Sequence, residues 1–131
     1  MPEDDHSEVL QANQGFYDAF GSLDIDRMET AWSRGDVVTC VHPGWPSLNG
    51  WFEVMQSWER IFSGATMMTF TITEPECTVS GDVAWVTCTE NLTTLVDGRV
   101  MSARVETTNI FRWRDRTWKM VHHHGSPAPD R

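Results

Sequence analysis

The first half of the chain carries apolar residues at the spacing expected of helices. One stripe ends near Gly21, a short one begins at Asp24, and a strongly amphipathic one begins at Asn49. Ser7 and Asp24 are suitable N-cap residues. The pattern predicts three helices, whose apolar positions are Val9, Ala12, Phe16, Ala19 and Phe20, then Ile25, Met28 and Trp32, then Trp51, Val54, Met55, Trp58, Ile61 and Phe62.

The second half of the chain changes to the alternation of β-strands. Gly81 and the pairs Asp97-Gly98 and Asp115-Arg116 have the character of turns between long strands. The predicted strands cover 37–41, 67–80, 82–96, 99–113 and 117–124. Helices followed by antiparallel hairpins are typical of an α+β domain. We therefore expect three N-terminal helices packed on one face of a curved, mainly antiparallel sheet.

The last two turns fix a strand register if each contains two residues. The first aligns Val86 with Asn109, and the second aligns Asn109 with His122 and Thr107 with His124. Because side chains alternate between the faces of a sheet, these residues share one face. The same face carries many apolar residues, so we expect it to be the concave face beneath the helices.

The predicted concave face combines apolar residues with polar ones. Its polar members are Glu90, Thr107, Asn109, His122 and His124. By the same alternation, His123 lies on the opposite face. That outer face also carries Trp85, Ile110 and Val121, and we expect it to contact solvent or a second copy in a homodimer.

Length and charge limit the possible classes of function. The 131 residues suffice for one domain, which we assign to 1–131, with a core over 7–127 and flexible ends. A net charge of -9 argues against a nucleic acid or an anionic membrane as partner, and no apolar run approaches the ~20 residues of a membrane span. The acidic N-terminus lacks signal-peptide features, and the three cysteines suggest free thiols. We therefore expect a cytoplasmic protein.

The concave polar residues allow two interpretations. Burying ionisable groups costs several kcal/mol unless hydrogen bonds or water compensate, so they form either a satisfied structural network or the wall of a ligand cavity. In the second interpretation His42, His122 and Glu90 are candidate acid–base residues, because shifted pKa values suit a histidine or a glutamate to proton transfer. The candidate ligand-binding residues are His124, Asn109, Thr107, Trp45, Trp58 and Tyr17.

A bound metal ion is a further alternative. His122 and His124 are two residues apart on one predicted strand, and His42 offers a third imidazole. However, no carboxylate stands at a characteristic metal-binding spacing from them. We therefore expect neither a metal nor another cofactor.

The order of elements and several motifs resemble a known family. The stretches that carry the resemblance are NQGFYDAFGSLDIDRMETAW, CVHPGW, GDVAWVTCTEN and ETTNIFRWRDRTWKMVHHHGSP. They resemble the cone fold of nuclear transport factor 2 (NTF2) and, more closely, the SnoaL-like domain family, from about Ser7 to Pro127. The ending WKMVHHHGSPAP also resembles the association domain of calcium/calmodulin-dependent kinases, which has the same cone.

The resemblance implies a small-molecule pocket inside a cone and a homodimer. The wider fold includes steroid isomerases, polyketide cyclases, dehydratases and epoxide hydrolases. The isomerase pattern departs from this chain at two points: its catalytic aspartate falls at His42, and its helix tyrosine aligns near Phe16 rather than Tyr17. We expect a small apolar or carbonyl ligand, used by a cofactor-independent isomerase, lyase or hydrolase, or held by a non-catalytic binding or dimerisation module.

Overall fold

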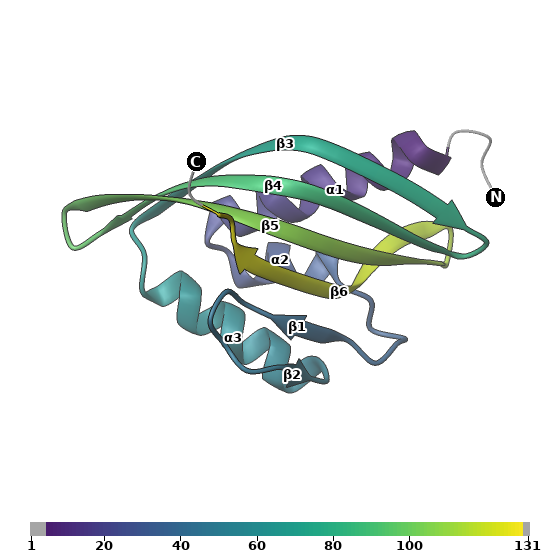
Figure 1. Cartoon of the computed structure of the whole chain (residues 1–131). Helices are drawn as coiled ribbons and strands as arrows, with labels where there is room; N and C mark the ends of the chain where they lie inside the picture. The colour runs from purple at the N-terminus through teal and green to yellow at the C-terminus, as the bar shows by residue number, and fades with distance from the viewer. Residues whose placement is uncertain (1–4, 130–131) are drawn as a thin grey trace.

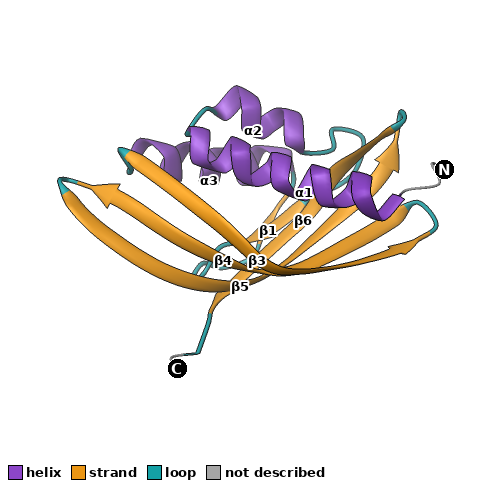
Figure 2. Ribbon diagram, turned by 90° about the horizontal axis from the view of Figure 1, so that it is seen from above, coloured by secondary structure: helices purple, strands orange, loops and turns teal. Residues whose placement is uncertain are grey.

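The structure is a computed structural model that describes residues 5–129. Its helices are α1 (Asp5–Ser22), α2 (Ile25–Ala31) and α3 (Trp51–Ser63). The strands are β1 (Thr39–Val41), β2 (Leu48–Asn49), β3 (Met67–Ser80), β4 (Val83–Val96), β5 (Arg99–Arg114) and β6 (Thr117–Pro127). They form one sheet in the order β2-β1-β6-β5-β4-β3 (Figure 1). All three helices lie on one face of this curved sheet (Figure 2), which confirms the predicted α+β class.

The predicted register between β4 and β5 is confirmed along the whole hairpin. Val86 lies opposite Asn109, and Cys88 lies opposite Thr107. The turn that sets this register holds Asp97 and Gly98 at φ values of 51° and 76°, as a two-residue hairpin turn of the favoured hand requires. The concave face of these two strands is therefore the predicted one.

The predicted register between β5 and β6 is wrong beyond its first pairs. Phe111 lies opposite Met120 as expected, but Ile110 then lies opposite His122, so Val121 is an extra residue in β6. Such a β-bulge moves every later side chain to the other face of the sheet. His123 therefore faces the helices, whereas His122 and His124 face outward.

Two features of the sheet were not predicted from the sequence: the partner of β1 and the strand β2. β1 pairs in parallel with β6, which places Thr39 beside His122 and Cys40 beside His123. β2 is a two-residue strand between β1 and α3, and it pairs with β1. Val37, expected to begin β1, lies before the strand and is 81% exposed.

Aromatic side chains fill the space between the helices and the sheet. Phe16 of α1 packs edge-on against Trp58 of α3, with ring centroids 5.7 Å apart, and Phe20 lies 4.7 Å from the same indole ring. Trp32, which follows α2, closes the cluster, and these residues are at most 6% exposed. Burying rings of this size is a dominant source of stability. The cone is thus closed by packed side chains.

The predicted flexible ends fall largely on residues 1–4 and 130–131, which lie outside the described residues. Among the helices of residues 5–129, none is both long enough and apolar enough to span a membrane.

Candidate functional site

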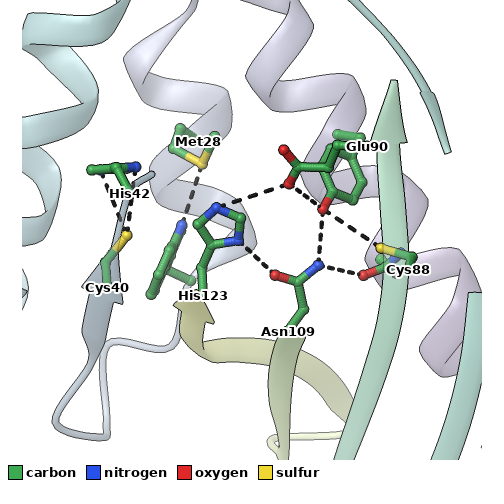
Figure 3. A network of polar contacts seen from close by, with 10 residues as sticks. Met28, Cys40, His42, Cys88, Glu90, Asn109 and His123 are labelled. Atoms are coloured by element: carbon green, nitrogen blue, oxygen red, sulfur yellow. Dashed lines mark hydrogen bonds and ion pairs between the residues drawn. The ribbon is translucent and has the colours of Figure 1, made fainter. Parts of the chain in front are cut away.

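Five polar side chains form a continuous chain of contacts between α1 and the concave face of the sheet (Figure 3). The Tyr17 hydroxyl donates to Glu90 Oε2 at 2.6 Å. Asn109 Nδ2 donates to the Tyr17 oxygen at 3.2 Å and to Asn13 Oδ1 at 2.8 Å. The other end of the Asn109 amide, Oδ1, lies 2.6 Å from His123 Nδ1. Glu90 Oε2 and His123 Nε2 are 4.0 Å apart, so the chain almost closes into a ring.

This cluster, which we name the cone network, is assembled from four elements. Asn13 and Tyr17 lie one turn apart on α1, so both side chains face the sheet. Glu90, Asn109 and His123 come from β4, β5 and β6. Asn13 was not among the predicted site residues, and His123 was predicted on the opposite face of the sheet. Asn13 lies within the apolar stripe of α1, and a polar residue at such a position indicates a buried polar contact.

The hydrogen bonds define the protonation state of His123. An amide oxygen can only accept, so His123 Nδ1 carries the hydrogen and Nε2 presents a lone pair towards Glu90. Burial, assisted by the charges of neighbouring histidines, holds the pKa of His123 well below its usual range. His123 is therefore a neutral imidazole whose basic nitrogen faces a carboxyl group.

The pKa of Glu90 shifts in the opposite direction to that of His123. Burial raises the pKa of this carboxyl, and the hydrogen bond from Tyr17 opposes the rise without cancelling it. Burial and the Glu90 charge in turn raise the pKa of Tyr17 well above 10, so the phenol remains a donor. Burial therefore shifts both Glu90 and His123 towards their neutral forms.

Two further side chains line the cone network. Cys88 Sγ lies 3.7 Å from the Tyr17 oxygen and 4.0 Å from Asn13 Nδ2. Burial raises the pKa of the Cys88 thiol, so it is not a reactive thiolate. The buried Thr107 hydroxyl makes no hydrogen bond of normal geometry within residues 5–129, but it acts on Glu90 and, with Tyr17, opposes the rise in the pKa of that carboxyl.

His42 occupies a separate buried position. Its ring packs edge-on against Trp58, with centroids 4.7 Å apart, and its Nε2 lies 2.9 Å from Ser57 Oγ. Because the Ser57 hydroxyl donates to the Val54 carbonyl at 2.6 Å, His42 Nε2 must be the donor towards Ser57. Burial lowers the pKa of His42 to about 4. His42, expected to be an acid–base residue, is therefore a packed, neutral ring.

The Cys40–His42 contact does not form a nucleophilic pair. Cys40 Sγ lies 3.6 Å from His42 Nε2 and 3.9 Å from Nδ1. Burial raises the pKa of the Cys40 thiol while it lowers that of the imidazole, so both groups stay neutral. A thiolate–imidazolium pair would need the opposite shifts.

His122 and His124 lie outside the cone, contrary to prediction. His122 Nδ1 lies 2.6 Å from Thr39 Oγ1 on the neighbouring strand, and burial lowers its pKa. His124 is exposed, with its ring 6.0 Å from that of His122. The extra residue Val121 accounts for both positions. Across residues 5–129, no group of three or more His, Cys, Asp or Glu side chains is placed to hold a metal ion.

The remaining predicted ligand-binding residues differ in access. Trp58 is fully buried in the aromatic cluster, and Trp45 lies at its edge, with the Arg60 guanidinium 5.1 Å from its ring. Tyr17 lines an open hollow of about 430 Å³ between α1 and β3, together with Met68 and Phe70. Because its hydroxyl contacts Glu90, Tyr17 stands between this hollow and Glu90.

Comparison with known proteins identifies the family. The profile of the SnoaL-like domain matches residues 9–130. The chain belongs to the SnoaL-like domain family. This SnoaL-like chain is 30% identical over 118 residues to the F-box protein SKIP8 of Arabidopsis thaliana. The match covers 90% of the chain and 48% of SKIP8, so the chain spans about half the length of that relative.

Solved structures share the fold of this SnoaL-like domain. A protein of Streptomyces avermitilis, named as a candidate dehydratase of the NTF2-like family, is 35% identical with a TM-score of 0.92; the match covers 99% of this chain and 100% of that one. A candidate calcium/calmodulin-dependent kinase II association domain of Thiobacillus denitrificans is 29% identical with a TM-score of 0.79, over 90% and 93%. A ketosteroid isomerase-like protein of Erwinia carotovora, 20% identical with a TM-score of 0.82 over 98% and 100%, shares the fold.

Proposed function

We propose that this SnoaL-like protein is a cofactor-independent acid–base enzyme, a lyase or isomerase that removes a proton next to the carbonyl group of a small, largely apolar compound. The observation that carries the proposal is the 4.0 Å separation of Glu90 Oε2 and His123 Nε2 inside a closed apolar cone. A neutral carboxyl beside a neutral imidazole offers a proton donor and a proton acceptor to the same face of a substrate.

Dehydration of a β-hydroxy carbonyl compound suits this pair. His123 Nε2 accepts the proton from the carbon next to the carbonyl, and Glu90 donates its proton to the leaving hydroxyl group. The carbon–oxygen bond breaks, a carbon–carbon double bond forms, and water leaves. The pair is then an imidazolium and a carboxylate, and proton transfer between them restores the neutral forms. The candidate dehydratase from Streptomyces avermitilis, 35% identical, supports this reaction class.

The other members of the cone network have positioning roles in this proposal. Asn109 accepts from His123 Nδ1 and so fixes the tautomer whose Nε2 is basic. Asn13 in turn accepts from the Asn109 amide and fixes its orientation. Thr107 turns its buried hydroxyl to the substrate carbonyl oxygen, where charge develops during proton removal. Tyr17 closes the route from the hollow between α1 and β3.

Proton exchange with solvent tests this proposal directly. The protein is incubated in deuterated buffer with small ketones and β-hydroxy ketones, and loss of the α-proton signal is followed by NMR. We expect Glu90→Gln and His123→Gln to lower the rate by about 100-fold or more, and the outward-facing His122→Gln to leave it unchanged. Equal rates in wild type and both cone variants, with the fold verified by circular dichroism, would refute the proposal.

A second candidate function is a non-catalytic binding or dimerisation module. The observation that favours it is the burial of the cone network, in which Glu90, Asn109 and His123 are at most 4% exposed. In this case the network specifies the fold, and the outer face of the sheet makes the functional contact. Trp85 is 37% exposed there and Ile110 and Val121 are half-buried, as a homodimer contact through that face would need.

Oligomeric state tests the second candidate. Trp85→Lys places a charge on the outer face without touching the cone, and native mass spectrometry then reports the subunit number. A dimer that dissociates in Trp85→Lys, combined with no turnover in the exchange experiment, favours the module. A monomeric wild type removes the dimer from the proposal.

A further inference from the structure

A second hollow, whose lining residues include none of the cone network, lies between the helices and the last hairpin. It has a volume of about 370 Å³ and opens to the surface between α1, α2 and the turn that joins β5 to β6. Its walls come from Gly15 of α1, Arg27 of α2, and Arg116 and Trp118 of the hairpin. Its volume is within the range of small-molecule sites. None of its lining residues belongs to the acid–base pair proposed above.

The rim of this hollow is cationic although the protein is acidic. Arg27, Arg116 and Lys119 come from separate segments of the chain and meet here, and Glu8 is the one carboxylate among the lining residues. The net charge of the whole chain is -9. Three cationic side chains at one opening therefore make a local reversal of the overall charge, which attracts anions.

The two arginines of the rim lack counter-ions within the described part of the chain. Neither Arg27 nor Arg116 has an ion pair there, and Lys119 donates to the carbonyl of Thr30. By contrast, Arg112 and Arg114 are both bound to Asp36. Guanidinium groups bind carboxylate and phosphate groups through paired hydrogen bonds. The free donors of Arg27 and Arg116 are suited to such a group.

The floor of the hollow is apolar and leaves room for a flat molecule. A Cβ atom added at Gly15 would meet no atom within 4 Å, so the space above α1 is open at this point. Trp118 lies beneath with 5% exposure, and its indole Nε1 hydrogen has no acceptor among residues 5–129. An aromatic or other planar group would pack on this floor while its charged group reaches the rim.

The turn beside the hollow holds Arg116 in an unusual backbone conformation. Asp115 and Arg116 have φ values of 53° and 62°, in the left-handed region that favours glycine or asparagine. The tight two-residue turn thereby fixes the backbone of Arg116 at the end of the hairpin. A cationic side chain on a fixed turn is better placed to bind than one on a long loop.

From these features we propose that the hollow binds a small organic anion, with its carboxylate or phosphate group held by Arg27 and Arg116 and its planar apolar part lying on Trp118 and Gly15. The site shares no residue with the cone network, although Arg27 also lines the hollow between α1 and β3. It would serve as a second ligand site at the opposite side of α1 from Glu90.

The test uses four probes on the full chain: phenyl phosphate, benzoate, inorganic phosphate and the uncharged benzyl alcohol. Binding is followed by the shifts of the tryptophan indole N–H signals in heteronuclear NMR, with the Trp118 signal assigned from Trp118→Phe. We expect phenyl phosphate or benzoate to shift that signal, and benzyl alcohol to bind much more weakly. Tighter binding of phenyl phosphate indicates a phosphate site, and tighter binding of benzoate a carboxylate site.

Exposed variants separate this site from general charge effects. Arg27→Gln with Arg116→Gln should weaken the anionic probe by roughly tenfold or more, whereas Arg99→Gln, at the distant β4–β5 turn, should not. Both arginines of the rim are exposed, so the fold should be retained. The proposal is overturned if no anionic probe shifts the Trp118 signal at millimolar concentration, if the double variant binds as wild type does, or if inorganic phosphate binds as tightly as phenyl phosphate.

Discussion

His123 Nδ1 lies 2.6 Å from Asn109 Oδ1 because β6 contains one more residue than its partner strand at Val121. Without that extra residue His122 would stand opposite Asn109, and the imidazole between Phe16 and Glu90 would come from a different histidine. The bulge therefore decides which of the three consecutive histidines belongs to the core. It gives neighbouring, chemically identical residues three different environments.

The three histidines should differ strongly in their effect on stability. His123→Ala removes a fully packed ring and leaves the Asn109 carbonyl oxygen without its donor, so we expect a loss of roughly 2–4 kcal/mol in the free energy of unfolding. His124→Ala, at an exposed position, should cost less than about 0.5 kcal/mol. Urea unfolding of the single variants measures the difference. Equal losses in the two variants would contradict the inward placement of His123.

The sequence predicted most of the architecture because its signals were local. The turn at Asp97-Gly98 fixed the β4–β5 register, and Asp24 caps α2 as expected, accepting from the Asp26 backbone N–H at 2.9 Å. The cone residues of those elements, Glu90 and Asn109, were therefore found. The pairing of β1 with β6 is long-range and parallel, and alternation within a short segment does not indicate a partner.

The bulge was the main feature that the sequence did not reveal. Val121 has no glycine or proline beside it, and either register gives an alternating strand with a histidine facing the cone. Tertiary packing decides between them: the inward ring must fit beside Phe16 and Trp58, with centroids 5.0 Å and 5.8 Å away. Because of the extra residue Val121, His123 and not His122 belongs to the candidate site.

Glu90 should make the protein less stable as pH rises. Its pKa in the folded state is raised above 4.5 by burial, so its contribution is fully present below that pH and is lost as pH increases through the raised value. Glu90→Gln stays neutral and can still accept from Tyr17. We expect this variant to be more stable than wild type at alkaline pH, with the advantage vanishing below pH 4.5. Chemical denaturation across pH measures this, with the exposed Glu59→Gln as control.

His42 should make the protein less stable as pH falls. Its pKa falls from 6.5 to about 4 on folding, so its contribution is present above pH 6.5 and is lost as pH falls towards about 4. The shift corresponds to about 3 kcal/mol of stability. His42→Gln keeps an amide donor for Ser57 and does not titrate, so its free energy of unfolding should fall less across this range. A variant as acid-sensitive as wild type would show that His42 does not titrate with unfolding.

Two glycines offer a matched test of packing. A Cβ atom at Gly125 would lie 2.9 Å from Val105 Cγ1 and 3.4 Å from the Pro43 ring, so Gly125→Ala should lose about 1–3 kcal/mol. The helical position Gly15 is open, and Gly15→Ala should gain about 0.5–1 kcal/mol. Thermal unfolding of both variants shows whether the first loses stability and the second gains it. A double-mutant cycle of Gly125→Ala with Val105→Ala should show favourable coupling, because the second change removes the clashing methyl group.

The rate at which a reagent labels Cys88 reports whether the cone opens in the native protein. Cys88 lines the cone network and Cys40 lies beside His42, and they are 4% and 0% exposed. In variants that retain only one of these thiols, a thiol reagent reports how often each becomes accessible.

If substrate enters where Tyr17 and Phe70 separate the α1–β3 hollow from Glu90, local opening should expose Cys88 more often than global unfolding does. We therefore expect Cys88 to be labelled faster than Cys40, at a rate almost independent of low denaturant concentrations, and faster still in Phe70→Ala. Labelling of both thiols only at the global unfolding rate would mean that the cone stays closed, and would favour the non-catalytic module over the enzyme.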